Sequence, residues 1–217
     1  HVSALPEESL AECPYIDYVI IGEGEESFYS LLENIDTPQN LYKIKGLGYR
    51  SNSKIIINPP SDHYIDMDTL PMPAWHLFDL KKYKEYPFRD KMINSNPHEF
   101  LLQTTRGCPY LCKFCSRNFG NKVRQKSPNI VVEEIAVLIN LFNAQYLLFA
   151  DETFTINKEY TKKLCTLIIE RGLNKKISWS CATRVDKLDK EVLMLMKNAG
   201  CVSIFVGLES GSQKILD

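Results

Sequence analysis

The chain has 217 residues, of which 44% are hydrophobic and 24% are charged, and 26 Lys and Arg residues nearly balance 27 Asp and Glu residues. This composition is typical of a globular protein and excludes a disordered, collagen-like or coiled-coil chain. The formal net charge of -1 excludes a strong overall attraction to nucleic acid or anionic membranes, but it allows a local basic groove. No apolar run approaches the roughly 20 residues that a membrane-spanning helix needs, so we expect a soluble protein. The compartment expected for it is the cytoplasm.

The first part of the chain reads as a short α/β fragment. Residues 17–22 have the pattern of a strand, and a helix follows to residue 35 with Phe28, Leu31 and Leu32 on one face. Two glycines in the intervening turn lack the third glycine of a dinucleotide-binding loop, and the glutamates around them would repel a pyrophosphate. We therefore expect these glutamates to complement the positive end of the helix.

A hairpin and a linker come next. Residues 47–50 and 54–57 flank a polar turn in the pattern of two paired strands. Residues 66–86 contain too many prolines for regular structure, and we expect an ordered linker between domains there.

From residue 99 onward, strand and helix patterns alternate. Strands are predicted at residues 100–104, 146–150, 177–182 and 203–206. A helix is predicted after each of the first three strands: the first helix is capped by Ser127, the second begins at Lys158, and the third is capped by Asp189. This succession predicts a parallel sheet built of right-handed βαβ units. In such sheets the active site lies at the carboxyl ends of the strands.

The cysteines point to a metal centre. The chain has seven cysteines, which is an odd number and too few for a disulfide scaffold. Three of them, Cys108, Cys112 and Cys115, form one CxxxCxxC array directly after the strand predicted at residues 100–104. Three thiolates on one loop can hold one metal centre and leave one metal position open for a cosubstrate. The alternative is a zinc site completed by Cys165, Cys181 or a histidine, although zinc sites usually combine two such arrays.

The array of Cys108, Cys112 and Cys115 resembles the signature of the radical S-adenosylmethionine (SAM) superfamily. The resemblance implies that the three cysteines hold three irons of a [4Fe-4S] cluster, whose fourth iron is bound by the amino and carboxylate groups of SAM. It also implies an external electron donor of the flavodoxin or ferredoxin type. The reduced cluster would cleave SAM to methionine and a 5'-deoxyadenosyl radical.

Two further strand ends fit this resemblance. Asp151 and Glu152 follow the second strand and resemble the acidic motif that contacts the SAM amino group, with Asp151 slightly preferred; an N-cap or turn for the next helix is the alternative. Arg184 follows the third strand, where the resemblance implies a contact with the SAM carboxylate. A structural pair with Asp186 or Glu209 is the alternative for this arginine.

The last strand and the cysteine array supply the remaining candidates. Glu209 and Ser210 lie in a segment that resembles the one that meets the SAM ribose hydroxyls in related proteins. Phe114 has the aromatic position before the last cysteine, where the backbone of family members lies beside adenine; simple packing is its alternative role.

Residues 1–4, 17–25 (DYVIIGEGE), 70–75 (LPMPAW) and 209–211 together resemble the radical SAM subfamily that carries a preceding cobalamin-binding domain. The expected fold is therefore a truncated partial parallel (β/α) barrel of the α/β class, preceded by the end of a Rossmann-like cobalamin-binding domain.

This resemblance sets the expected domain organisation. It assigns residues 1–36 to the cobalamin-binding-like domain, 37–98 to the hairpin and linker, and 99–217 to the radical SAM core. Both ends of the chain read as cuts in a longer polypeptide, so cobalamin is expected only in that longer protein. Two strands of a six-stranded partial barrel would be missing, which leaves the strand at 203–206 as an unpaired edge. The histidines are expected to be ordinary surface or packing residues, namely His63, His76 and His98.

The leading hypothesis is a radical SAM enzyme that performs methyl transfer or oxidative cyclisation on an unidentified small organic substrate. The first alternative is a tRNA methylthiotransferase-like enzyme, which predicts a basic RNA-binding extension and a second set of three cysteines upstream. The second alternative is a non-catalytic iron-sulfur electron carrier, in which carboxylates and Arg184 at successive strand ends would have no purpose. A nucleic acid partner is not expected from the balanced charge.

Overall fold

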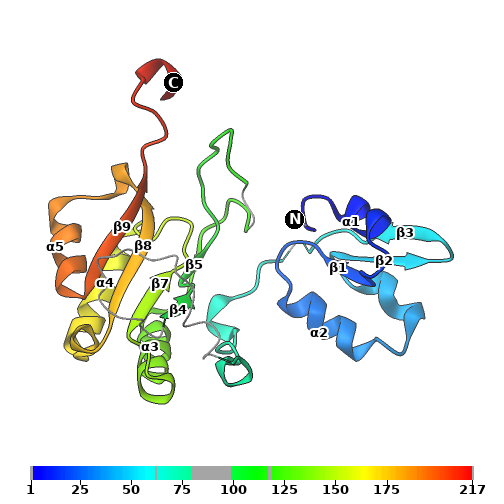
Figure 1. Cartoon of the computed structure of the whole chain (residues 1–217), viewed down its shortest axis with the longest axis horizontal. Coiled ribbons are helices and arrows are strands. Elements are labelled where there is room, and N and C mark those ends of the chain that lie inside the picture. Colours follow the sequence, from blue (N-terminus) through cyan, green and yellow to red (C-terminus); the bar gives the residue numbers. More distant parts are fainter. Residues whose placement is uncertain (1, 62, 80–98, 117–118, 217) are drawn as a thin grey trace. The chain divides into compact units, whose positions relative to one another are not determined.

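The computed structural model describes residues 2–61, 63–79, 99–116 and 119–216. They form two compact units, His1–Ile65 and Asp66–Asp217 (Figure 1). The domain boundary that the sequence placed after residue 36 falls inside the first unit, because the strand before it pairs with the hairpin after it. None of the described helices is long and apolar enough to span a membrane.

The first unit is a small antiparallel sheet with two helices. Its strands pair in the order β1-β2-β3, and the predicted hairpin is confirmed. The elements are α1 (Pro6–Glu12), β1 (Tyr18–Ile20), α2 (Glu25–Glu33), β2 (Leu47–Ser51) and β3 (Lys54–Ile57), with a 3-10 helix at Pro38–Lys43. Asn52 and Ser53 both have positive φ, at 47° and 62°, as a two-residue hairpin turn requires.

The helix α2 presents a different face to the core from the one that the sequence predicted. Leu31 is 4% exposed, but Phe28 and Leu32 are each 54% exposed. The inward position one turn before Leu31 belongs to Ser27, whose hydroxyl donates a hydrogen bond to the Lys45 carbonyl at 2.7 Å. Because this hydrogen bond satisfies the buried Ser27 hydroxyl, the helix can direct Ser27 and Leu31 toward the core and leave Phe28 and Leu32 exposed.

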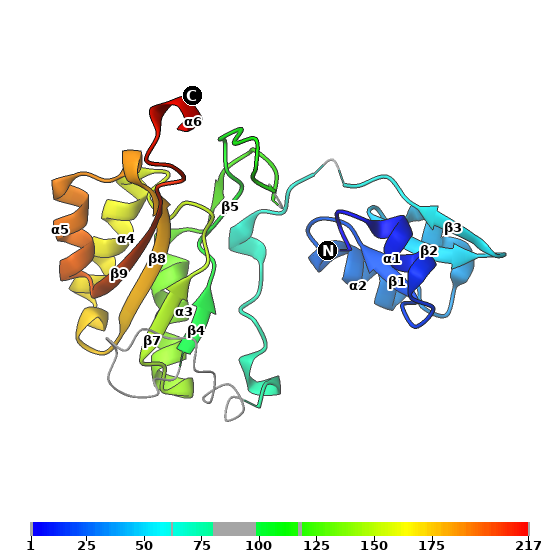
Figure 2. The same ribbon diagram turned by 45° about the horizontal axis from the view of Figure 1, so that its top comes forward.

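The second unit confirms the predicted parallel sheet. Four strands lie in the order β4-β7-β8-β9, and all neighbouring pairs are parallel. The strands are β4 (Glu99–Leu102), β7 (Tyr146–Phe149), β8 (Ser178–Arg184) and β9 (Cys201–Gly207), and the connecting helices are α3 (Pro128–Phe142), α4 (Lys158–Glu170) and α5 (Lys190–Asn198). The three helices cover one face of the sheet (Figures 1 and 2), as right-handed connections between successive neighbours require. No closed barrel forms within the described strands.

The core of this unit lies between the sheet and the three helices. Phe149, Phe154 and Trp179 are each 1% exposed and contact one another with ring centroids 4.8 to 5.2 Å apart. On the opposite face of the sheet, Leu101 of β4 is 55% exposed. The edge strand β9 pairs only with β8 among the described strands, as the sequence predicted, and Phe205 on it is 54% exposed.

The helix ends follow their sequence signals with one exception. Asp189 caps α5 by accepting a hydrogen bond from the Val192 N–H at 2.9 Å, and Gly172 follows α4 with a φ of 65°. Ser127 occupies the N-cap position of α3, but its side chain makes no capping bond. Its hydroxyl donates instead to the carboxylate of Asp68, a contact that no local pattern predicts.

The described part of the proline-rich linker packs on the second unit. Met72 and Trp75 lie against its core, and the Trp75 ring meets the Phe100 ring edge-on at 5.1 Å. Two short 3-10 helices occur there, Met67–Thr69 and Trp75–Leu77. His63 and His76 are exposed, as expected, whereas residues 80–98 of the linker, with His98, lie outside the described residues.

Candidate active site

The candidate residues gather at the carboxyl ends of the parallel strands. After β4, the two-stranded ribbon of β5 (Thr105–Arg106) and β6 (Arg124–Gln125) carries the cysteine loop, residues 107–123, of which 117 and 118 lie outside the described residues. The loop and the end of β9 lie at the same edge of the sheet (Figure 2). Parallel pairing therefore brings the segments that follow β7, β8 and β9 to the edge from which the loop emerges.

Backbone hydrogen bonds and close contacts hold the cysteine loop in a compact form. The Cys108 N–H donates to the Gly120 carbonyl at 3.1 Å, and the Cys115 N–H donates to the Cys112 carbonyl at 3.1 Å. Gly107 has a φ of 87°, and a Cβ there would lie 2.2 Å from the Lys122 carbonyl oxygen. The loop can therefore take this form only with glycine at position 107.

The donor set of the loop suits an iron-sulfur cluster. Cys108, Cys112 and Cys115 are free thiols, and Cys115 is exposed. Thiolates are the ligands that iron-sulfur clusters prefer, and three of them on one short loop match a cluster with one iron left open. No three Cys, His, Asp or Glu side chains of the described ranges are gathered in the geometry of a metal site. The three cysteine sulfurs are thus chemically suitable ligands, but in this structure they are not arranged around a common centre.

The cysteines proposed for the zinc alternative lie in the hydrophobic core. Cys165 and Cys181 are 0% exposed, and burial raises the pKa of the Cys165 thiol to about 12. The pKa of Cys181 is also raised, chiefly by a hydrogen bond with Cys201 and then by burial. Thiols with raised pKa values stay protonated and are poor metal ligands. Both thiols belong to the hydrophobic core cluster of the second unit, so the zinc alternative finds no ligand in either of them.

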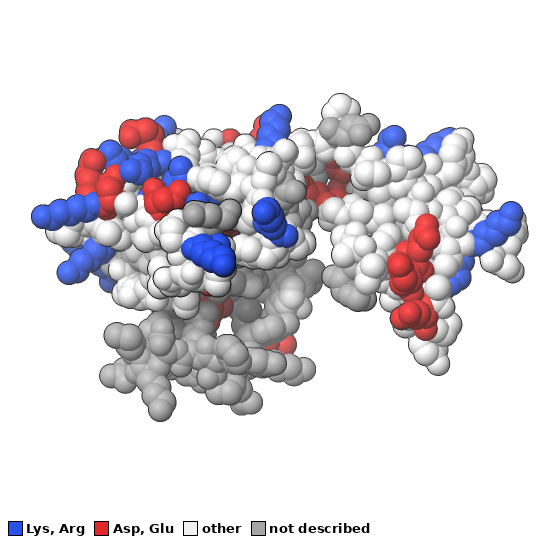
Figure 3. All heavy atoms as spheres, turned by 90° about the horizontal axis from the view of Figure 1, so that it is seen from above, with Lys and Arg blue, Asp and Glu red and all other residues white. Residues whose placement is uncertain are grey.

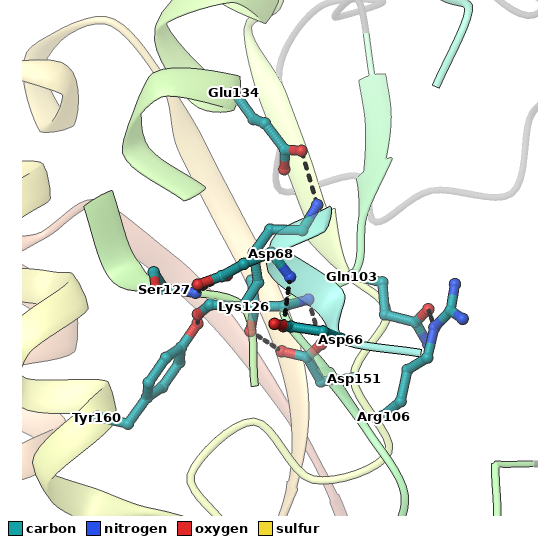
Figure 4. A network of polar contacts seen from close by, with 10 residues as sticks. Asp66, Asp68, Gln103, Arg106, Lys126, Ser127, Glu134, Asp151 and Tyr160 are labelled. Carbon is teal, nitrogen blue, oxygen red and sulfur yellow. Dashed lines mark hydrogen bonds and ion pairs between the residues drawn. The ribbon is translucent and has the colours of Figure 1, made fainter. Parts of the chain in front are cut away.

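Asp151 is buried just after the end of β7. Its carboxylate, labelled in Figure 4, accepts hydrogen bonds from three donors. They are the Thr104 N–H at 2.7 Å, the Thr104 hydroxyl at 2.6 Å and the Thr105 N–H at 2.8 Å. Burial raises its pKa to about 6, although the same hydrogen bonds act to lower it. The helix that follows is capped by Asn157, so Asp151 is not the N-cap that the sequence offered as its alternative role. Both carboxylate oxygens are occupied within the protein.

Glu152 is the neighbouring carboxylate, and one of its oxygen atoms can still accept a hydrogen bond. Its Oε2 atom is buried and makes no hydrogen bond to any described atom. Burial raises its pKa, whereas the Gly107 N–H and the positive charge of Arg124 lower it. These contacts bring Glu152 to the base of the cysteine loop. An unpartnered buried acceptor there can receive a hydrogen bond from a cationic ligand group.

Arg184 joins the end of β8 to the cysteine loop. Its Nε and Nη2 atoms donate to the two carboxylate oxygens of Asp186 at 2.9 and 3.2 Å, which is one of the two structural pairs that the sequence offered. The guanidinium also lies 3.9 Å from the ring centroid of Tyr110, and its Nη1 atom lies 3.9 Å from the Cys112 sulfur. Sequence reasoning missed Tyr110, because an aromatic residue between two cysteines carries no signal for a cation partner.

Glu209, Ser210 and Phe114 lie on the exposed rim. Glu209 has a positive φ of 56°, and its carboxylate folds over Gly207, where a Cβ would lie 2.3 Å from Oε1. Within the described part of the chain, Glu209 makes no ion pair with Arg184. The Ser210 hydroxyl accepts a hydrogen bond from the Ser212 N–H at 3.0 Å. Phe114 is 73% exposed, which does not fit its alternative role in packing.

A second set of contacts holds the exit of the cysteine loop (Figure 4). The Lys126 ammonium lies 2.6 Å from Glu134 of α3, and both side chains are nearly buried, at 6% and 7% exposure. The Lys126 carbonyl accepts a hydrogen bond from the Tyr160 hydroxyl at 2.7 Å, and its N–H donates to the Thr104 carbonyl at 2.8 Å. Burial is the main cause of the raised pKa of Tyr160, which therefore stays a hydrogen-bond donor.

The linker adds a contact one residue further on. The Ser127 N–H donates to Asp68 Oδ1 at 2.5 Å, so both the entry and the exit of the loop are tied to other elements. We call these anchors, made by Asp151, Lys126, Glu134, Tyr160 and Asp68, the loop clamp. The partners are far apart in sequence, and no local pattern could have revealed them.

These features define an α/β protein with a three-cysteine loop at the carboxyl edge of a parallel sheet. The model of the radical SAM superfamily matches residues 102–217. The chain therefore belongs to the radical SAM superfamily.

Matches to two curated relatives extend over the whole chain. The chain is 35% identical over 221 residues to an uncharacterised methyltransferase of Pyrococcus horikoshii, of which it covers 45%. It is 32% identical over 223 residues to the anaerobic magnesium-protoporphyrin IX monomethyl ester cyclase of Cereibacter sphaeroides, of which it covers 35%. The chain thus spans less than half the length of these relatives.

A solved structure shows the same fold. The radical SAM methyltransferase TsrM of Kitasatospora setae, with cobalamin and a [4Fe-4S] cluster bound, matches with a TM-score of 0.74 at 20% identity. The match covers 99% of this chain and 41% of that protein. At this level of identity the likeness concerns the fold alone.

Proposed function

We propose that the chain is the core of a radical SAM enzyme that transfers a methyl group to a small organic substrate or cyclises it oxidatively. The observation that carries this proposal is the cysteine loop at the carboxyl edge of the sheet, with Glu152 and Arg184 beside it. The methyltransferase and cyclase relatives support both reaction types. Cys108, Cys112 and Cys115 would hold a [4Fe-4S] cluster, which when bound and reduced supplies the electron that cleaves SAM.

The protein's own residues would bind and orient SAM. Glu152 would accept hydrogen bonds from the SAM amino group through its unpartnered oxygen, which reverses the earlier preference for Asp151. Arg184 would meet the SAM carboxylate with the outer side of its guanidinium while Asp186 holds the inner side. Glu209 and Ser210 would meet the ribose hydroxyls. The backbone around Phe114 would lie beside adenine.

Three further assignments concern the longer protein. Residues 1–36, which lie within the first compact unit, would be the end of a cobalamin-binding domain, as the resemblance implied, and the fold shared with the cobalamin-bound TsrM supports this assignment. An external carrier of the flavodoxin or ferredoxin type would supply the electron. The cytoplasm, where thiols stay reduced, would be the compartment that suits the free cysteines.

The test is anaerobic reconstitution with iron and sulfide, followed by incubation with SAM and a reductant. We expect a protein-bound [4Fe-4S] cluster and 5'-deoxyadenosine, or S-adenosylhomocysteine where SAM serves as the methyl donor. Cys112→Ala should lose the cluster, whereas the matched variant Cys13→Ala should keep it. A protein that binds zinc alone and yields neither product would refute the proposal.

SAM affinity tests the assigned ligands. Glu152→Gln and Glu209→Ala should each weaken SAM binding by about tenfold to a hundredfold, because a hydrogen bond to a charged group contributes about 1.5 to 3 kcal/mol. The cluster should remain, since neither residue binds iron. The exposed Glu170→Gln serves as the matched control. Unchanged affinity in either site variant would remove that residue from the site.

The two alternative functions predict other products. A methylthiotransferase would add sulfur and a methyl group to RNA, and it predicts a second three-cysteine set, whereas the 217 residues contain one such array. An electron carrier would undergo reversible reduction without cleaving SAM. Mass spectrometry of RNA and of SAM products after the same incubation separates the three functions.

A further inference from the structure

The Arg184 guanidinium is in contact with three different side chains. Its Nε and Nη2 atoms donate to Asp186, its Nη1 atom lies 3.9 Å from the Cys112 sulfur, and its central carbon lies 3.9 Å from the centroid of the Tyr110 ring. A guanidinium has five N–H groups, and the contacts with Asp186 and Cys112 use three of them. Two N–H groups therefore remain, which is the number that a bidentate hydrogen bond to a carboxylate needs.

The ion pair with Asp186 is too exposed to fix this guanidinium by itself. The Arg184 and Asp186 side chains are 40% and 49% exposed, and exposed ion pairs contribute little because water and salt screen them. Figure 3 shows basic and acidic side chains mixed in the same way over α4 and α5, where Lys158 pairs with Asp189. A long arginine side chain also loses rotamer freedom when it is held in one place. A further contact is therefore needed to keep Arg184 at the cysteine loop.

The Tyr110 ring supplies that contact from within the cysteine loop. Tyr110 lies between Cys108 and Cys112 in the sequence, and a tyrosine ring is a flat, rigid surface that is ordered at a low cost in conformational entropy. The distance of 3.9 Å to the guanidinium is well within the range of about 6 Å for a cation–π interaction. The Lys187 ammonium lies 5.5 Å from the same ring centroid. Two cations that follow β8 thus meet one ring of the loop.

We propose that Tyr110 is a positioning residue, which holds Arg184 between the Cys112 sulfur and the site of the SAM carboxylate. The inference rests on the proposed function, because it concerns a cluster on Cys112 and SAM at Arg184. A positive charge and an N–H donor beside a ligand sulfur favour the reduced form of a cluster, which is the more negative one. The two remaining N–H groups of Arg184 stay available to the carboxylate. Tyr110 thus acts on the cluster and on the cosubstrate through the arginine.

The first experiment is a redox titration of the reconstituted protein with titanium(III) citrate, followed by electron paramagnetic resonance without SAM. Arg184→Gln should lower the ratio of reduced to oxidised cluster at a given potential by about tenfold, which is about 59 mV for one electron. Tyr110→Leu should shift the potential in the same direction by a smaller amount. Tyr110→Phe, which keeps the ring, should match the wild type. An unshifted potential in Tyr110→Leu, or an equal shift in Tyr110→Phe, would overturn the proposal.

The matched control is Tyr42→Leu. Tyr42 is a tyrosine of the first unit that is 64% exposed and has the Lys43 ammonium 5.6 Å from its ring centroid. This variant also removes a ring beside a cation, but far from any cysteine of the loop in the sequence. Its potential should equal that of the wild type, and a shift as large as that of Tyr110→Leu would overturn the proposal.

SAM affinity is the second readout, measured by calorimetry on the protein with an oxidised cluster. Tyr110→Leu should bind SAM about fivefold more weakly, because a cation–π contact contributes roughly that factor to the placement of Arg184. In the Arg184→Gln background the same tyrosine substitution should have no further effect. Equal losses in the two backgrounds would show that the ring acts independently of the arginine, and would overturn the proposal.

A double-mutant cycle in the cluster-free chain separates this inference from the proposed function. Urea unfolding of the wild type, Tyr110→Leu, Arg184→Gln and the double variant should show a coupling of about twofold to fivefold in the unfolding equilibrium constant. A wild type that takes up no reducible cluster refutes the proposed function, and the cycle then decides whether the ring holds the arginine. If Tyr110→Leu alone takes up no cluster, coupling in the cycle supports the proposal and additive effects overturn it.

Discussion

Replacement of Asp151 distinguishes an anchor of the cysteine loop from a ligand of SAM. Thr104 and Thr105 are 0% and 1% exposed, and Asp151 is the acceptor for both of their N–H groups. Asp151→Ala would leave these two donors buried without partners, at a cost of about 1 to 3 kcal/mol each. We therefore expect a loss of about 2 to 6 kcal/mol at low pH, where the carboxyl group is uncharged, which is a large part of the stability of an ordinary domain. At neutral pH the loss should be smaller, because the substitution also removes a buried charge.

Asp151→Asn should behave differently. The amide oxygen can keep both N–H bonds, and the Thr104 hydroxyl can turn to accept from the amide nitrogen. The substitution also removes the unfavourable burial of a charge, since the rise in the Asp151 pKa from 3.8 to about 6 corresponds to about 3 kcal/mol. We expect this variant to be at least as stable as the wild type at neutral pH and to retain iron.

The pH dependence follows from the sign of the shift. Because the pKa of Asp151 is higher in the folded protein than in the unfolded chain, its contribution to stability is fully present below about pH 4 and is lost as the pH rises through about 6. The wild type should lose about 1.4 kcal/mol from this group between pH 5 and 7.5, and Asp151→Asn should lose none of it.

Urea unfolding at the two pH values measures these free energies, and Asp36→Ala on the exposed surface of the first unit is the control. Isothermal titration with SAM completes the assay. The reasoning would be refuted if Asp151→Ala unfolded like the wild type, or if Asp151→Asn kept its stability and lost SAM binding. The second result would make Asp151 the cosubstrate ligand that the sequence favoured.

Three further tests, which use four substitutions, concern other parts of the site. Cys112→Ala should abolish iron binding while Cys165→Ala retains it, as measured by iron analysis; equal losses would indicate four-cysteine ligation. Lys126→Met should lower stability by about 3 to 5 kcal/mol in urea unfolding, because it leaves Glu134 buried without its partner, and a neutral effect would contradict that assignment. Gly107→Ala should prevent cluster assembly, seen in the absorbance spectrum, because a Cβ would lie 2.2 Å from a backbone carbonyl oxygen; a normal spectrum would show that the loop adapts.

Local sequence patterns predicted most of the second unit. The apolar spacing in α3 and the caps at Asp189 and Gly172 are properties of neighbouring residues, so the βαβ succession and the parallel sheet follow from them. The three cysteines likewise identify their own loop. The role of each carboxylate could not be predicted, because Asp151 and Glu152 are adjacent in sequence and point to different partners at the end of a strand.

Contacts between residues that are far apart in the chain could not be predicted from the sequence either. Ser127 has the identity and position of an N-cap, yet its hydroxyl is used by Asp68, which is 59 residues away. In α2, periodicity indicated an apolar face, but the Ser27 hydroxyl donates a hydrogen bond to the Lys45 carbonyl, 18 residues away, and Phe28 and Leu32 of the predicted face are exposed. In both cases a polar group gained a tertiary partner that overrode the local preference.

The loop clamp has a consequence for the order in which the protein is assembled. Its anchors fix residues 104, 105, 126 and 127, and none of them uses a cysteine. We therefore expect the scaffold to form without iron, in contrast to zinc fingers, which are unfolded without their metal. Backbone amides at the loop ends should exchange slowly with solvent deuterium in the iron-free protein, while those around Cys112 should exchange quickly. Cluster insertion then becomes a local ordering step within a folded protein, and loss of the cluster to oxygen leaves a chain that is ready to be reloaded.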